Sequence, residues 1–148
     1  MSYVLLLIPE KSLRDRIWAE SGRPRIFNPH IPIIEVNGNF SIVHATTAAL
    51  ADTIDQLKVT LNPDAADKKI RAESLAALCE TTHEAMYTIT KQVFSGELKR
   101  DYGQKGTCVA PENGWCAEFI AKVLYLFEVE KGEYSLRASF PLKNLINS

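Results

Sequence analysis

A turn sequence between two β-rich runs is the feature that most limits how this chain can fold. Residues 30–36 and 40–45 are rich in apolar and β-branched side chains, and Asn37-Gly38-Asn39 separates them. Asn-Gly between such runs is a strong hairpin signal, because both residue types tolerate the positive φ angles of tight turns. We therefore expect an antiparallel hairpin over residues 30–45. Pro32 cannot donate to a sheet ladder, so its strand should be an edge strand or bulged at that point.

Apolar periodicity and turn residues predict the other elements. Pro9 ends a first apolar run, and Asn62-Pro63 places proline at the first position of a helix. From these signals we expect a buried strand at 3–8, a short helix at 13–19, two helices between 62 and 96, a loop with at most one strand at 97–114, and a last strand at 134–140.

Cys116 stands at the start of a further predicted helix. The apolar positions 119, 120, 123, 124 and 127 fit one helix face, which predicts a helix from Cys116 to Phe127. A thiol at a helix N-terminus faces unpaired N–H groups and the positive end of the dipole, which stabilise its thiolate. The same N–H groups can donate to an oxyanion. Cys116 is therefore a candidate nucleophile, and a small core residue at a helix start is the alternative interpretation.

His30 and His44 are the candidate proton-transfer residues. If the turn comprises residues 37–39, His44 lies opposite Pro32, and His30 is its diagonal neighbour on the same face. That arrangement suits a base and a second imidazole that orients it. A two-residue turn would instead place the histidines on opposite faces.

The order of these motifs resembles that of circularly permuted papain-like cysteine hydrolases. Residues 29–45 are similar to the histidine hairpin of that group, and Cys116-Ala117-Glu118-Phe119-Ile120 is similar to its cysteine motif. The group is related to NlpC and includes YiiX-like proteins and lecithin:retinol acyltransferase-like enzymes. The resemblance implies an α+β, papain-like fold in a single domain over residues 1–148. In that fold an antiparallel sheet carrying the histidine hairpin packs on the cysteine helix.

The resemblance also implies a chemistry. His30 would take the proton of Cys116, the thiolate would attack an amide or ester carbonyl, and His44 would orient His30. Tyr102 and Trp115 would lie near the substrate or the oxyanion. The implied function is a peptidase-like or amidase-like thiol hydrolase acting on a peptide or lipid acyl substrate. An acyltransferase or lipid hydrolase of the same fold is the alternative.

Two other functions remain open. The residues around His30 and the segment His44-Ala45-Thr46 superficially resemble the paired His-x-Thr/Ser motifs of two-histidine phosphodiesterases. Pro32 replaces the hydroxyl residue of the first motif, and the two segments are close for motifs that separate halves of such folds supply. A binding or scaffold protein that keeps the fold without activity is the other alternative, and rapid labelling of Cys116 by a small electrophile would argue against it.

Composition suggests a cytoplasmic domain without a cofactor. The net charge of −1 gives no electrostatic reason to expect nucleic acid as a partner, and no stretch reaches the ~20 apolar residues of a membrane span. Three cysteines cannot all pair within one chain, which favours a reducing compartment. Cys79 and His83 are four residues apart but have no further ligands at suitable spacing, so we expect no metal. The oligomeric state remains open.

Overall fold

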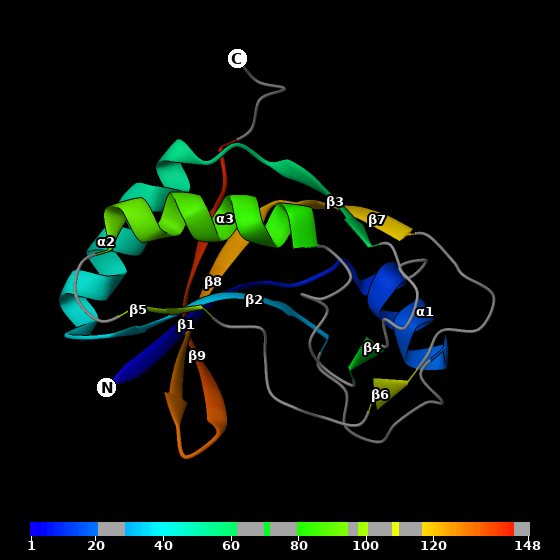
Figure 1. Cartoon of the computed structure of the whole chain (residues 1–148), viewed down its shortest axis with the longest axis horizontal. Helices are drawn as coiled ribbons and strands as arrows, with labels where there is room; N and C mark the ends of the chain where they lie inside the picture. Colours follow the sequence, from blue (N-terminus) through cyan, green and yellow to red (C-terminus); the bar gives the residue numbers. More distant parts are fainter. Residues whose placement is uncertain are drawn as a thin grey trace.

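The computed structural model describes residues 1–20, 29–61, 70–71, 80–94, 98–100, 108–109 and 117–143 (Figure 1). These residues form β1 (Ser2–Leu7), α1 (Lys11–Glu20), β2 (Ile31–Asn37), α2 (Phe40–Thr53), β3 (Leu57–Leu61), β4 (Ile70–Arg71), α3 (Glu80–Val93), β5 (Leu98–Arg100), β6 (Cys108–Val109), β7 (Ala117–Ala121), β8 (Val123–Glu130) and β9 (Glu133–Pro141). Within these ranges, no helix is long and apolar enough to cross a membrane.

The main sheet is antiparallel, and β1 lies at its centre. Across the described residues its strand order is β5-β2-β1-β8-β9, so β1 pairs with β2 on one side and with β8 on the other. Residues 3–7 of β1 are all buried, which explains why this strand is a continuous apolar run rather than an alternating one. Two short pairs, β3 with β7 and β4 with β6, lie outside the main sheet.

The side chains of β1 alternate between the two faces of the main sheet. Tyr3, Leu5 and Leu7 belong to the hydrophobic core, and the Tyr3 ring lies 5.9 Å from the ring of Phe40 in α2. We call this the helix face, because α2 and α3 pack on it (Figure 1). Successive side chains of a strand point to opposite sides, so the buried Val4 and Leu6 point to the other face, which we call the opposite face.

The predicted hairpin over residues 30–45 is wrong in its second half. Its first strand forms as β2, and a register shift beside Pro32 is the bulge expected there. Residues 40–53 form α2 instead of a strand. The Asn39 side chain accepts a hydrogen bond of 2.8 Å from the Ser41 backbone N–H and caps the helix. The buried residues of α2 recur at helical spacing: Val43, Thr47, Leu50 and Ala51.

The predicted helix from Cys116 to Phe127 is also wrong. β7 pairs with β3, and β8 pairs with both β1 and β9, so residues 117–130 are almost entirely in strands. Burial alternates at the start of β8, where Leu124 and Leu126 are buried between half-buried neighbours. The papain-like fold needs a cysteine helix packed on a histidine hairpin. The structure forms neither, so that fold prediction and the family resemblance are wrong.

Three of the locally predicted elements are confirmed. β1 matches the predicted strand at 3–8 except at Ile8, and α1 and β9 cover the helix at 13–19 and the strand at 134–140. Between residues 62 and 96 the structure has α3, but β4 lies where a further helix was expected, and residues 62–69 and 72–79 are outside the described ranges. The expected loop at 97–114 contains β5 and β6.

Candidate functional site

His30 lies directly before β2 and points to the opposite face. Ile31, the first residue of β2, pairs with Leu7 and belongs to the helix-face core, so the alternation of side chains turns His30 the other way. The His30 side chain is half-buried, and its Nε2 atom is buried. At the end of β2 that follows His30, Ile31 pairs with Leu7 of β1, which anchors the backbone next to the imidazole.

Two aromatic rings accompany His30 on this face. The ring of Tyr134 in β9 lies 6.0 Å from the His30 ring, at an interplanar angle of 59°. The ring of Phe127 in β8 lies 6.3 Å from the Tyr134 ring. Phe127 pairs with Val4 of β1, which places it on the same face as His30. We call His30, Phe127 and Tyr134 the His30 cluster; it offers an imidazole and a phenol side by side on an apolar base.

His44 lies on the helix face, apart from the His30 cluster. It sits in α2, with its ring 5.6 Å from Phe40 and 5.0 Å from Phe140, both in edge-on contact. Phe140 pairs with the buried Leu124 and packs against the core. The structure therefore does not bring His30 and His44 together, because the segment that carries His44 is a helix and not the second strand of a hairpin.

The remaining predicted site residues lie outside the described residues: Cys116, Tyr102 and Trp115. Ala117 begins β7, so the helix N-terminus on which the argument for an activated Cys116 thiol depended is not formed. The same holds for the oxyanion site that the N–H groups of that helix were expected to provide.

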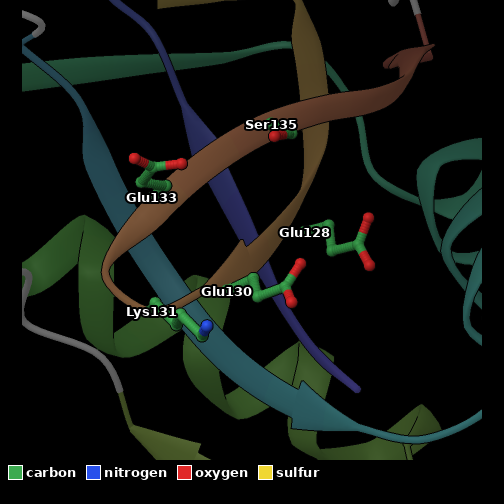
Figure 2. A pocket seen from close by; sticks show the side chains of 5 residues that line it. All are labelled: Glu128, Glu130, Lys131, Glu133 and Ser135. Carbon is green, nitrogen blue, oxygen red and sulfur yellow. The ribbon is translucent and has the colours of Figure 1, made fainter.

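A polar pocket of about 180 Å³ lies along the β8–β9 hairpin. Its lining side chains are shown in Figure 2: Glu128, Glu130, Lys131, Glu133 and Ser135. Glu128 accepts a hydrogen bond of 3.0 Å from Arg137, so part of its charge is already compensated. Among the residues that the structure describes, no group of three or more His, Cys, Asp or Glu side chains is arranged to hold a metal ion.

A second, more apolar hollow of about 520 Å³ lies between α2 and α3. It is lined by residues of the two helices: Ala45, Thr46, Ala49, Leu50, Thr53 and Val93. These are small or uncharged side chains with no group that transfers protons near neutral pH. The His30 cluster is therefore the arrangement in the described structure that is best equipped for chemistry.

Comparisons with known proteins find structures but no sequence relatives. No family model matches the chain, and no curated protein matches it significantly. Similar solved structures include Escherichia coli LigT in apo form (TM-score 0.48, 16% identity, 96% of this chain and 97% of that chain covered) and LigT complexed with ATP (0.49, 13%, 96% and 98%). LigT complexed with 3′-AMP is similar to the same degree (0.48, 13%, 95% and 96%). These are not papain-like proteins.

Phe127 and Tyr134 were not among the candidate residues predicted from the sequence. The sequence pattern gave neither residue a role of its own: Phe127 was predicted on the core face of the cysteine helix, and Tyr134 in the last strand. A signal for their pairing is present in Lys131-Gly132, which separates two β-rich runs and forms the turn between β8 and β9. A hairpin predicted at that turn would have placed Tyr134 near Phe127.

Proposed function

We propose that this chain hydrolyses a phosphodiester and that His30 is its proton-transfer residue. The observation that supports this proposal is the position of the half-buried His30 directly before β2, with the Tyr134 ring beside it. Imidazole is the side chain that gains and loses a proton near neutral pH, which makes it the usual general acid or base. Pairing of the adjacent Ile31 with Leu7 of β1 holds the backbone beside it in place, and proton transfer in a transition state requires a positioned group.

The type of reaction that we propose depends on which of the predicted catalytic groups the structure supports. Thiol hydrolysis and acyl transfer on a peptide or lipid substrate were predicted from a helix at Cys116 that is not formed, so these functions are wrong. The phosphodiesterase alternative needs a histidine on a strand, which His30 provides. Its supposed second motif at His44 lies in α2 on the helix face. The proposed site therefore contains His30 and not His44.

The test is hydrolysis of bis(4-nitrophenyl) phosphate and of a dinucleoside phosphate by the purified full chain. His30→Asn keeps a polar side chain of similar size but removes the titrating group. We expect kcat/KM to fall by roughly 10²–10⁴-fold, the usual contribution of a general acid or base.

The matched control is His44→Asn, which removes an imidazole from the other side of the sheet and should keep the activity of the unaltered chain. Cys116→Ser should also keep it. The proposal fails if the unaltered chain binds phosphate compounds without turnover, or if both histidine variants lose activity equally. Escherichia coli LigT has been crystallised with 3′-AMP, ATP, phosphate and NADP⁺, and we choose 3′-AMP and phosphate as the ligands for binding measurements.

We also propose a cytoplasmic location. An odd number of cysteines leaves at least one thiol unpaired within the chain, and thiols persist in a reducing compartment. Counting free thiols with a chromogenic disulfide reagent, in protein purified under non-reducing conditions, tests this. Three reactive thiols after denaturation are expected, and one would indicate a disulfide.

A further inference from the structure

Hydrolysis of a phosphodiester requires two proton transfers, one from the attacking water and one to the leaving oxygen. The chain has three histidines, His30, His44 and His83. His44 lies on the helix face, and His83 is a residue of α3. If His30 carries one of the two protons, the group that the structure places beside it for the other is a phenol, on Tyr134.

Tyr134 is the residue with an ionisable hydroxyl group that the fold places beside His30. The centroids of the two rings are 6.0 Å apart, so the imidazole and the phenol are neighbours on the opposite face. The Tyr134 side chain is half-buried, with Phe127 against its ring, which leaves it accessible to a ligand while limiting its movement. A phenol keeps its proton at neutral pH and can donate it to an oxygen that develops negative charge.

The hairpin turn fixes where Tyr134 stands. Lys131 and Gly132 form a two-residue turn with φ angles of 52° and 81°, and Tyr134 pairs with Val129. Such turns match the natural twist of a β-ribbon, so the register of β9 against β8 is set at the turn. Tyr134 therefore belongs to a well-defined element and not to a loop.

We propose that Tyr134 is the general acid of the reaction, in the place of a second histidine; this rests on the function proposed above. His30 accepts a proton from water as the water oxygen bonds to phosphorus. The bond from phosphorus to the leaving oxygen breaks, and the Tyr134 hydroxyl gives its proton to that oxygen. The proton on His30 then returns to the phenolate through solvent, so water is consumed, an alcohol and a phosphomonoester are released, and both side chains are restored.

The experiment compares leaving groups in Tyr134→Phe. An alkoxide leaving group, as in a dinucleoside phosphate, needs a proton, whereas 4-nitrophenolate departs without one. We expect kcat for the dinucleoside phosphate to fall by roughly 10²-fold or more, with little change for bis(4-nitrophenyl) phosphate. A purely structural role would lower both rates by the same factor. The ratio of the two rates within one variant is also unaffected by any loss of folded protein.

Two further variants distinguish a wrong role for Tyr134 from a wrong proposed function. Tyr87→Phe removes a half-buried phenol from α3 and should leave both rates unchanged. His30→Asn should lower both rates, because every substrate needs the attacking water activated. If His30→Asn is inactive and Tyr134→Phe loses both rates equally or neither, the role of Tyr134 is refuted and the proposed function stands. If His30→Asn is fully active, the proposed function itself is refuted.

Discussion

Asn39 shows how one side chain directs the path of the backbone after β2. Its carboxamide oxygen accepts the backbone N–H of Ser41, and its own φ and ψ of −76° and 133° are extended. An extended residue whose side chain satisfies an otherwise unpaired N–H group is the usual start of a helix. The chain therefore leaves β2 into α2, and His44 is carried to the helix face as a consequence.

We predict that Asn39→Ala destabilises the protein by about 1 kcal/mol, within the range of roughly 0.5–2 kcal/mol known for lost N-caps. The N–H of Ser41 would lose its acceptor and the helix would fray from its first turn. Urea denaturation followed by circular dichroism measures the change. Asn39→Ser, which keeps an acceptor, should retain most of the stability; an equal loss in both variants would mean that the cap is not the cause.

At the scale of elements, the β8–β9 hairpin depends on its turn. Lys131 and Gly132 both have positive φ angles, which an L side chain adopts at a cost and glycine adopts freely. The turn brings Tyr134 beside Phe127 on the opposite face, so its geometry affects the His30 cluster directly.

We predict that Gly132→Ala lowers the free energy of unfolding by about 1–2 kcal/mol, because alanine is strained at that φ. Lys131→Asn should be neutral or stabilising, since asparagine tolerates the left-handed region better than lysine does. Thermal denaturation of both variants measures their stability and tests the two predictions. A stable Gly132→Ala variant would show that the turn relaxes to another type.

The elements that could be predicted from sequence are those defined by local patterns. The apolar run of β1 and the β-rich run of β9 needed no distant information. The residues of β8 were predicted to be helical because their apolar positions also fit one helix face. They form a strand because they pair with β1 and β9. The candidate site could be predicted only in part, for a related reason. His30 can be recognised from the sequence because it stands at the start of a predicted strand. Tyr134 comes close to it only through pairings between segments that are far apart in the chain.

At the scale of the whole molecule, the main sheet separates two environments. Helices α2 and α3 cover one face with a hydrophobic core, and the His30 cluster lies on the other. The hollow between α2 and α3 contains no residue of that cluster.

We predict that 3′-AMP perturbs amide resonances near His30, Phe127 and Tyr134 and leaves those along the buried side of α2 unchanged. Two-dimensional heteronuclear NMR of the labelled full chain measures this, with inorganic phosphate as a second ligand. His30→Asn should weaken the shifts, and His44→Asn should not. Shifts centred on Ala45 and Ala49 would place the ligand in the hollow between the helices and contradict the proposed site.

The central position of β1 has a consequence for how the protein is made. Leu5 pairs with Ile34, which follows it closely in the sequence, but its other partner, Leu126, is translated much later. Until β8 leaves the ribosome, β1 has an unpaired apolar edge, which is the kind of edge that promotes aggregation. Pairing across such a sequence separation also slows folding. Chains truncated before β8 would keep that edge permanently, so chaperones and proteases should recognise incomplete copies readily.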